Sequence, residues 1–304
     1  MSQLCDLHTH STHSDGTLAP GELVEQAWRA GITQLALTDH DSVGGLPEAL
    51  SRAAELGMEL LPGVELSVTE DGGRREMHIL GFGIDPSSPA MTQGIVRLQR
   101  DRKERGRRMV ERLNESGVEL SFGHVEGLAG PGALGRPHVA LALVETGLCS
   151  SVDDAFARYL RRGRPGHVVR DGPDARHAIG LIHEAGGIAC LAHPPLSRGV
   201  EAPGGLDAFV GQLVRLGLDG LEIQHPSHGP ATRKRLRRLA RRFDLVASGG
   251  SDFHGATRPG VSLGRGRGNL ALGPELYAAV TARVRERRAR LTVLGSAGKV
   301  QRLQ

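Results

Sequence analysis

The feature that most constrains the fold is a repeated alternation of short apolar runs with helical segments. Segments 20–31 and 46–57 each have proline near the start and glycine at the end, as helices commonly do. A strand candidate follows each of them, "ITQLALTDHD" after the first and "ELLPGVELSV" after the second. Such alternation is typical of β–α units around a largely parallel sheet.

The alternation is interrupted once and then resumes. "REMHILGFG" is a strand candidate joined to the one before it by "EDGG" (70–73), a strong turn signal. Later, helices predicted at 173–185, 206–216 and 230–243 alternate with the strands "GIACLAH", "DGLEIQH" and "DLVASGGSDFH". The total of about seven strands, each followed by a helix or loop, favours an α/β barrel over a small doubly wound sheet.

The interruption covers residues 89–170 and has no strong strand candidate. It contains a long charged helix, predicted at 92–117, followed by glycine-rich loops and short helices around 137–162. We therefore expect a barrel formed by residues 1–88 and 171–304, with residues 89–170 as an inserted helical cap subdomain.

Composition is ordinary for a globular chain except in its basic residues. With 304 residues, 39% hydrophobic and 24% charged, the chain is long enough to bury a sizeable core. Of 38 basic residues only three are lysines, which leaves 35 arginines. Codon bias in the source genome is the simpler explanation, and bidentate binding of phosphate is the other. The net charge of +4 fits an anionic substrate without establishing one.

The cysteines and the hydropathy pattern indicate a cytoplasmic protein. Cys5, Cys149 and Cys190 show neither paired spacing nor a metal-knuckle pattern, so we expect reduced thiols. No apolar run approaches the ~18 residues that a membrane span requires, and no signal peptide precedes Cys5.

The stretch "DLHTHSTHSDGT" (6–17) places three histidines and two aspartates in twelve positions. His8 and His10 are two residues apart, so on a strand both side chains leave the same face. That geometry suits two imidazoles binding one cation. Taken alone, the stretch is also compatible with a His-rich surface loop.

Metal-capable residues recur where the predicted strands end, which is where the loops of an α/β barrel assemble an active site. The combination of His with Asp and Glu, without Cys, points to Mn²⁺, Zn²⁺ or Fe²⁺. Nine candidates are too many for one ion, and with Glu65 as a bridge they would serve two or three metals, as in phosphoryl displacement. The candidates are His8, His10, Asp39, His40, Glu65, His78, His193, Asp252 and His254.

The same residues carry a resemblance to a known family. "DLHTHSTHSDGT", "LALTDHDSVGG", "PGVELSV", "MHILGFG", "LAHPP" and "SGGSDFH" resemble, in order, the motifs of the polymerase-and-histidinol-phosphatase (PHP) superfamily. The resemblance implies a distorted (β/α)₇ TIM-like barrel with an inserted helical subdomain. It also implies two or three divalent metal ions, Mn²⁺ first, with Zn²⁺, Fe²⁺ or Mg²⁺ as alternatives.

Carried over residue by residue, the resemblance assigns a ligand set. His8, His10 and Asp252 would hold the first metal, and Glu65 would bridge it to the second, which His78 and His193 complete. The third metal would be held by Asp15, His40 and His254. Asp15 stands where many family members have His, and His13 matches no ligand position.

The middle of the chain resembles one stand-alone branch of the family, which includes nucleoside 3′,5′-bisphosphate phosphatases and 5′→3′ exoribonucleases. The matching segments are "GRPHVALALVETG", "YLRRGRPGHV" and "GLEIQHPSH". The resemblance implies that Arg136, His138, Arg164 and His228 face substrate phosphate; for the two arginines a surface salt bridge is the alternative. After His193 and Pro194 the branch often has Gly-Arg, whereas this chain has Pro195 and Leu196. An arginine contact is then either lost or supplied by Arg198.

We therefore expect a metal-dependent phosphoesterase that removes the 3′-phosphate of nucleoside 3′,5′-bisphosphates and trims short RNA in the 5′→3′ direction. Glu65 and Asp252 would act at the metals, and His228, or else His138, would protonate the leaving oxygen. Histidinol-phosphate phosphatase is the alternative enzyme, and a non-catalytic PHP binding module is the alternative of another class. A nucleotide or short RNA is the expected partner, with no membrane and no polymerase subunit; the sequence leaves the oligomeric state open.

Overall fold

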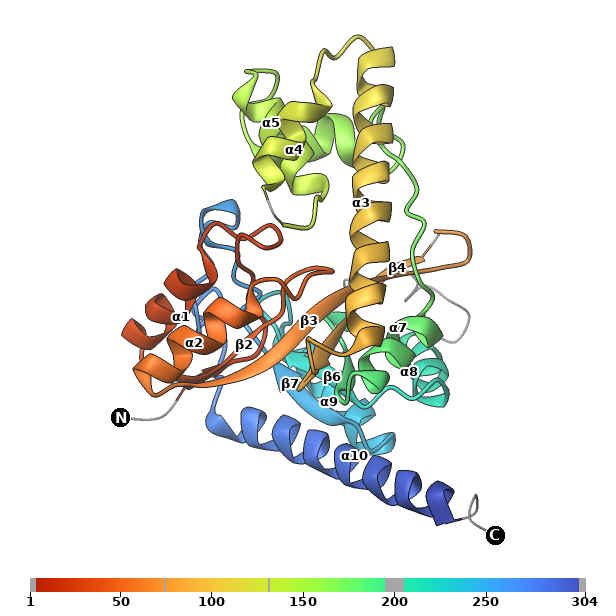
Figure 1. The fold of residues 1–304 in the computed structure, drawn as a ribbon. Coiled ribbons are helices and arrows are strands. Elements are labelled where there is room, and N and C mark those ends of the chain that lie inside the picture. The colour runs from red at the N-terminus through yellow and green to blue at the C-terminus, as the bar shows by residue number, and fades with distance from the viewer. Residues whose placement is uncertain (1–3, 74, 131, 195–204, 301–304) are drawn as a thin grey trace.

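The computed structural model describes residues 4–73, 75–130, 132–194 and 205–300 (Figure 1). Its strands are β1 (Leu4–Asp6), β2 (Ile32–Leu37), β3 (Glu59–Glu70), β4 (Arg75–Phe82), β5 (Ile188–Leu191), β6 (Gly220–Gln224) and β7 (Val246–Gly249). Its α-helices are α1 (Pro20–Arg29), α2 (Leu46–Leu56), α3 (Pro89–Glu115), α4 (Phe122–Ala129), α5 (Arg136–Glu145), α6 (Val152–Ala155), α7 (Ala175–Glu184), α8 (Gly205–Arg215), α9 (Pro230–Arg242) and α10 (Pro274–Val300). A π-turn, η1 (Phe156–Leu160), follows α6, and a 3₁₀ turn, η3 (Gly255–Thr257), follows β7.

The strands lie side by side in sequence order from β1 to β7, so the expected number of strands is confirmed within the described residues. β4 is antiparallel to both β3 and β5, and the other neighbouring pairs are parallel. The reversal comes from the "EDGG" turn, where Asp71, Gly72 and Gly73 all have positive φ. A hairpin here replaces a helical crossover, which distorts the regular β–α repeat.

Backbone hydrogen bonds beyond the strand ends join β7 to β1. Leu7 N–H donates to Gly249 O (3.2 Å), and Asp252 N–H donates to His8 O (2.8 Å). Gly250 permits this approach, because a Cβ there would lie 2.3 Å from the backbone nitrogen of His8. The first and last metal-capable motifs of the chain therefore become neighbours.

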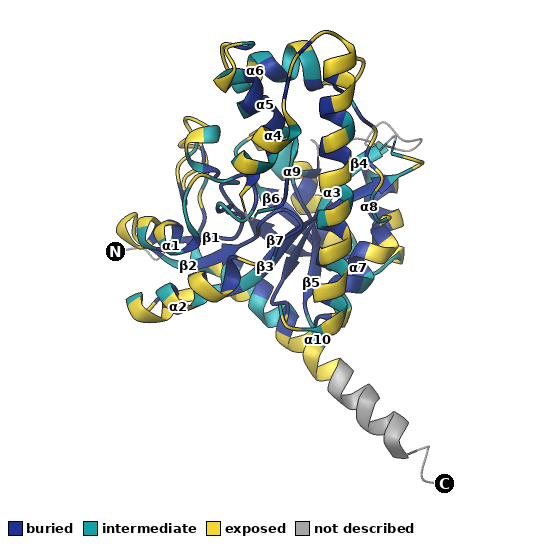
Figure 2. Ribbon diagram, turned by 45° about the horizontal axis from the view of Figure 1, so that its top comes forward, coloured by how far each residue is buried: buried dark blue, intermediate teal, exposed yellow. Residues whose placement is uncertain are grey.

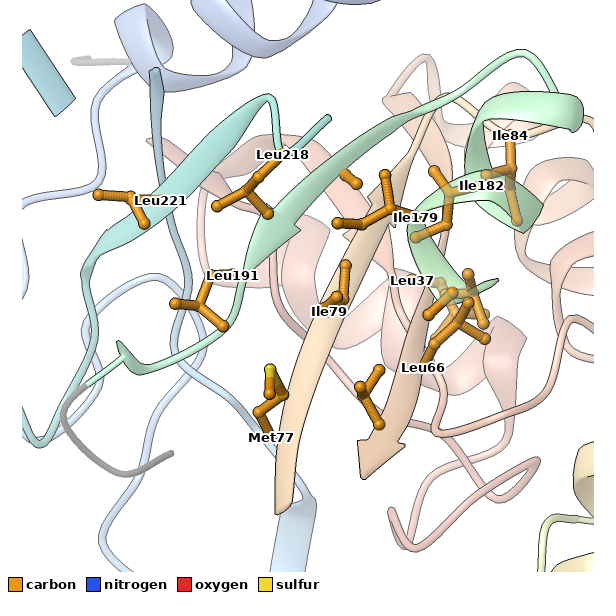
Figure 3. Packing of buried hydrophobic residues seen from close by; sticks show 14 of the residues in the cluster. Leu37, Leu66, Met77, Ile79, Ile84, Ile179, Ile182, Leu191, Leu218 and Leu221 are labelled. Carbon is orange, nitrogen blue, oxygen red and sulfur yellow. The ribbon is translucent and has the colours of Figure 1, made fainter. Parts of the chain in front are cut away.

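Side-chain alternation divides the strands into an outer and an inner apolar face. Figure 3 shows the outer face, where Ile79 and Leu191 pack toward Ile179 and Ile182 of α7. The inner face carries Leu80 and other residues that pack against α10. Because α10 lies across the end of the barrel opposite α4 and α5 (Figure 1), it closes the barrel base and leaves the other end for polar groups.

The long helix α3 connects the barrel to the helices between residues 89 and 170. Its first half packs on the barrel core through Met91 and Ile95. Its second half packs through Met109 and Leu113 on α4 and α5, which form a separate apolar cluster. The outward side of α3 is exposed (Figure 2), and the described residues between 89 and 170 contain no strand. The subdomain boundaries at 89 and 170 stay a prediction.

A buried ionic network fixes α3 over the barrel. Asp41 follows β2, has a positive φ of 46° and is fully buried. Its carboxylate accepts hydrogen bonds from Arg102 Nε of α3 (2.5 Å), from Arg170 Nη2 (2.8 Å) and from the backbone N–H of Ser67 (2.7 Å). Burial opposes ionisation of Asp41, but the two guanidinium groups lower its pKa to about 2. The network therefore ties α3, and the segment that ends the helical region, to the strands.

Among the described residues, no helix has the length and apolar character needed to cross a bilayer.

Replacing Asp41 with Asn preserves the side-chain volume and an acceptor for Ser67 but removes the charge that two buried guanidinium groups share. We expect Asp41→Asn to lower the free energy of unfolding by about 3 kcal/mol, because each guanidinium stays buried without a counter-charge. Urea unfolding of the metal-free protein measures the loss. Glu55→Gln is the control, since Glu55 is exposed and pairs with Arg52 on the surface, and it should cost less than about 1 kcal/mol. Equal small losses in the two variants would contradict the prediction.

Candidate metal centre

The polar end of the barrel collects the predicted ligands from every part of the sheet. Backbone bonds set their register: Asp41 N–H donates to Glu65 O (3.0 Å) and Glu65 N–H to Asp39 O (3.1 Å), which places His40 beside Glu65. Three groups of side chains have ligand atoms within 4.8 Å of one another. They are His8, His10, Glu65 and Asp252; His10, Asp15, His40 and His254; and His40, Glu65 and His78.

The buried carboxylate of Glu65 is the centre of the arrangement. Its Oε2 lies 3.1 Å from His8 Nε2, 3.3 Å from His10 Nε2 and 3.0 Å from His40 Nδ1. Its Oε1 lies 2.9 Å from His78 Nδ1 and 3.0 Å from His193 Nε2. The two oxygens thus face different sets of imidazoles, as a carboxylate that bridges two ions requires.

Several ligand atoms point into the cluster without a hydrogen-bond partner. His10 Nε2, His40 Nδ1, His78 Nδ1, His254 Nε2 and Asp15 Oδ1 are all buried and unsatisfied. Orphaned buried polar atoms are costly unless something else binds them. Imidazole and carboxylate donors without thiolates suit borderline-to-hard divalent cations. The residues present therefore fit divalent metal ions.

Two aspartates complete the groups. Asp252 Oδ1 lies 3.4 Å from His8 Nε2 and 3.3 Å from His10 Nε2. Asp15 Oδ1 lies 3.2 Å from His254 Nε2. Asp15 thus places a ligand atom in the group that also contains His10, His40 and His254.

Two further acidic residues orient the cluster from behind. Glu222 of β6 lies 2.8 Å from His8 Nδ1 through Oε1, and its Oε2 accepts the backbone N–H of His193 (2.7 Å). Such contacts fix the ring orientation of a ligand histidine. Asp39, predicted as a possible ligand, accepts hydrogen bonds from Ser11 N–H (2.7 Å) and from the Ser14 hydroxyl (2.6 Å). It belongs to none of the three groups and instead fixes the loop that carries Asp15.

The proximity of opposite charges shifts the pKa values of the buried groups. Burial alone would raise the pKa of Glu65, but the imidazoles of His40 and His8 hold it well below its usual range. Burial lowers the pKa of His10, yet the carboxylates of Asp252 and Glu65 beside its ring raise it to about 9. Glu65 therefore stays ionised and ready to bind cations at neutral pH.

Two of the predicted ligand residues adopt a backbone conformation that non-glycine residues rarely use. His193 has φ of 31° and Asp252 has φ of 53°. Such strain costs of order 1–3 kcal/mol per residue and concentrates at functional sites. Here it turns each side chain inward immediately after its strand.

A cavity of about 470 Å³ opens beside the cluster. His78 and His193 reach it from the metal-ligand set, and Arg258 and Arg267 line its other side. The guanidinium of Arg258 pairs with Asp252 Oδ2. The cavity therefore combines metal-capable groups with positive charge, as an anionic ester requires.

The predicted phosphate-facing residues have different surroundings. His138 is buried, with Nδ1 accepting the Gly135 N–H (3.0 Å), and burial lowers its pKa while Asp15 opposes the shift. Arg136 lies 3.5 Å from Glu76, which precedes His78 by two residues on the same face of β4. Arg164 is exposed, and no side-chain contact links it to the cluster within the described residues. Pro195, Leu196 and Arg198 lie outside the described residues.

His228 lies behind the cavity. Its Nδ1 is 3.0 Å from Ile223 O, so Nδ1 carries the proton and Nε2 is a buried, unsatisfied acceptor. Burial lowers its pKa to about 4, which keeps the ring neutral at pH 7. The ring of His225 lies between, with centroids 5.2 Å from His228 and 5.3 Å from His193.

Sequence reasoning missed four residues at the site: Glu222, His225, Arg170 and Arg258. His225 directly follows β6 and lies 3.2 Å from Asp252 Oδ2 through Nε2. The strand-end rule that found the other ligands applied to it equally. Burial lowers the pKa of His78, and the positive charge of Arg170 adds to this shift. Arg170 reaches the site from a segment that is distant in the sequence, so no local pattern could have indicated it.

The comparisons with known proteins agree with this geometry. A family model described as the PHP domain matches residues 6–186. A 3′,5′-nucleoside bisphosphate phosphatase of Chromobacterium violaceum is 37% identical over 85% of this chain and 90% of its own length. A 5′–3′ exoribonuclease of Haemophilus influenzae is 38% identical over 84% of this chain and 91% of its own length. A solved structure from Bifidobacterium adolescentis, described as a metal-dependent phosphoesterase, matches with a TM-score of 0.82 at 31% identity, covering 93% of this chain and 97% of that one. The resemblance in the motifs is thereby confirmed, and the chain belongs to the PHP domain family.

Proposed function

We propose that this metal-dependent phosphoesterase removes the 3′-phosphate from nucleoside 3′,5′-bisphosphates and trims short RNA from its 5′ end. The observation that carries the proposal is the convergence of imidazole and carboxylate atoms on Glu65, beside a cavity lined by Arg258 and Arg267. The similarity to a bisphosphate phosphatase and to an exoribonuclease supports the choice of substrate. The three free cysteines support a reducing, cytoplasmic location.

Two or three divalent ions, Mn²⁺ first among Mn²⁺, Zn²⁺, Fe²⁺ and Mg²⁺, would be held by the three groups. When bound, they supply a nucleophile at neutral pH and polarise the phosphoryl oxygens. His8, His10 and Asp252 would hold one ion, and His78 and His193 a second, with Glu65 between them. Asp15, His40 and His254 would hold the third. This assignment follows the resemblance to the family motifs: the first and third sets each lie within one group of ligand atoms, and His78 and His193 both face Oε1 of Glu65.

Positive side chains would hold the phosphate oxygens. Arg258 and Arg267 line the cavity, and Arg136 approaches β4 two residues before His78. Guanidinium groups bind phosphate through two parallel hydrogen bonds, which fixes its orientation. With one phosphate at the metal groups, the second phosphate of a bisphosphate would be held by arginines such as these. Arg164 stays a candidate for the same role.

The leaving ribose oxygen needs a proton, and imidazoles are suited to give it. His228 and His138 are the candidates from the sequence, but burial lowers the pKa values of both, so their rings are neutral at pH 7 and poorly suited to donate the proton. His225 lines the cavity and separates His228 from the ligand histidines. We therefore propose that His225 donates the proton to the leaving oxygen. His228 lies behind His225, and His138 lies on the side of Asp15.

The first prediction from the proposed function concerns the substrate. With Mn²⁺ added, we expect phosphate release from adenosine 3′,5′-bisphosphate with kcat/KM at least about 100-fold above that for histidinol phosphate, because only the bisphosphate uses a second anion site; about 100-fold corresponds to 2.7 kcal/mol of transition-state binding. A chelator should abolish release. Equal or greater turnover of histidinol phosphate would favour the alternative enzyme. Absence of any metal-dependent turnover would favour a non-catalytic module.

The second prediction concerns Glu65. Glu65→Gln removes the bridging charge while keeping the side-chain volume, so we expect loss of at least one bound metal and a fall of kcat of about 10³-fold or more. Metal content per chain, measured by plasma mass spectrometry after dialysis, is the primary readout. Glu70→Gln is the matched control on the same strand, because Glu70 accepts the N–H of Ala175 outside the cluster. Wild-type metal content in Glu65→Gln would argue against a bridging role.

The third prediction separates proton donation from phosphate binding. His225→Asn should lower kcat for adenosine 3′,5′-bisphosphate by about 10²-fold, with less loss on p-nitrophenyl phosphate, whose leaving group needs no proton. His228→Asn should show the same selectivity with a smaller loss, and metal content should stay at the wild-type level in both. If both substrates lose rate equally, the histidines position phosphate or metal and do not donate the proton.

A further inference from the structure

Helix α9 carries an unusual concentration of positive charge. Its sequence, PATRKRLRRLARR, has seven basic residues in thirteen and no acidic residue. Leu236, Leu239 and Ala240 are buried against the barrel. The basic side chains occupy the opposite side, where Lys234, Arg237, Arg238 and Arg241 are exposed.

Carboxylate partners are few on α9, although it carries seven basic residues. Arg29 and Arg52 of α1 and α2 pair with Glu25, and Arg288 of α10 donates to the carbonyls of Gly83 and Gly186. On α9, Arg235 and Arg242 share the single carboxylate of Asp207. Among the described residues, no carboxylate lies within ion-pair distance of Lys234, Arg237, Arg238 or Arg241. A chain-wide preference for arginine does not explain a local absence of acidic partners.

The basic side of α9 is hollowed and begins near the metal centre. A surface groove of about 560 Å³ is lined by Ala231, Lys234, Arg238 and Arg241 among others. Pro226 lines the cavity at the metal centre, four residues before α9 begins. The Asn269 side chain donates to Pro226 O (2.8 Å), which fixes the loop bearing Arg265 and Arg267 beside the same segment. Positive groups thus continue from the cavity, through Arg267, to α9.

We propose that the groove of α9 binds the sugar-phosphate backbone of single-stranded RNA whose 5′ end lies in the metal centre. The proposal rests on the proposed function and adds a surface for the nucleotides downstream of the reacting one. Thirteen helical residues span about 20 Å, enough for several nucleotides. Since α9 has no aromatic residue on which bases could stack, the contact would be with phosphates, independent of sequence and sensitive to salt.

An anionic membrane is the other polyanion that a basic helix can bind, and the surroundings of α9 disfavour it. Interfacial helices insert large apolar side chains into the bilayer. The large hydrophobic residues exposed in the described part of the chain are Trp28, Val96 and Val169, and none belongs to α9. The apolar side of α9 is already used by the barrel core.

The test compares substrates of different length in two charge-reversal variants. Lys234→Glu with Arg238→Glu alters the groove, and Arg285→Glu with Arg290→Glu makes the same change in net charge on exposed arginines of α10, across the barrel base. For a 5′-phosphorylated 20-nucleotide RNA at low salt, we expect kcat/KM to fall about 10- to 100-fold in the α9 variant and less than about 2-fold in the α10 variant. Turnover of adenosine 3′,5′-bisphosphate should be unchanged in both, because a mononucleotide does not reach α9.

Salt dependence provides a second, independent readout. Losing two phosphate contacts should reduce the slope of log(kcat/KM) against log[salt] by about 1.4 for the long RNA. Lys234→Gln with Arg238→Gln, which only neutralises the charges, should show a smaller loss of rate in the same direction. Equal losses in the α9 and α10 variants, equal losses on RNA and mononucleotide, or turnover of wild-type protein that does not depend on RNA length would each overturn the proposal.

Direct binding separates this proposal from the proposed function. Fluorescence anisotropy with a labelled 20-nucleotide RNA needs no turnover, so weaker binding by the α9 variant alone supports the surface even if no nucleotide is hydrolysed. If the protein turned over none of the substrates but still bound RNA, the proposed function would be contradicted and the proposed RNA contact on α9 would be unaffected. Sedimentation with phosphatidylserine vesicles covers the alternative. If the α9 variant loses vesicle binding but binds RNA like the wild type, the proposal is wrong and the surface is a membrane contact.

Discussion

The interaction on which the rest of the site depends is the burial of one carboxylate, Glu65, among five imidazole nitrogens. A carboxylate has about four lone-pair positions, so the five imidazole nitrogens around Glu65 cannot all donate a hydrogen bond to it. The unsatisfied nitrogens of His10, His40 and His78 show where the deficit lies. Divalent cations remove it, because each nitrogen and each carboxylate oxygen then has a positive partner. Metal binding would therefore relieve unfavourable electrostatic contacts in the metal-free cluster. Metal affinity and the stability of the barrel should consequently be linked.

The sheet makes this concentration of polar groups tolerable by separating it from the apolar core. On β3 and β4 the same inward-facing rows carry Glu65 and His78 toward one end and Leu61 and Leu80 toward the other, where α10 covers them. The two hairpin strands β3 and β4 carry Glu65 and His78 within the strands, whereas the other predicted ligands lie in the loops that follow their strands. The hairpin therefore places His78 of β4 beside Glu65 of β3, where His78 and His193 face the same carboxylate oxygen of Glu65.

What could be predicted of the fold and the site depended on whether the sequence pattern lay within a few neighbouring residues. The strands, the helices near them and the ligands at their ends were readable, because alternation and strand ends are patterns within a few residues. Asp39 shows the limit of that rule: it stands beside His40 at the end of β2, yet Ser11 and Ser14 use its oxygens. Arg170 and Arg258 reach the site through contacts between segments far apart in sequence, which only the folded chain creates. His225 directly follows β6 and so had the same local signal. The resemblance to the branch motif pointed instead to His228, three residues later.

The arginines, which composition alone left ambiguous, have at least three physical roles that burial and partners distinguish. Arg102 and Arg170 are buried on Asp41 and hold the helical region over the barrel mouth. Arg258 and Arg267 line the cavity, one of them paired with a ligand aspartate. Those on α9 are exposed and largely without acidic partners. A bias in the genome can raise the number of arginines, but it cannot sort them by environment. An RNA bound as proposed would meet the arginines of the cavity at its 5′ end and those of α9 along its downstream phosphates, an arrangement suited to electrostatic guidance of a polyanion.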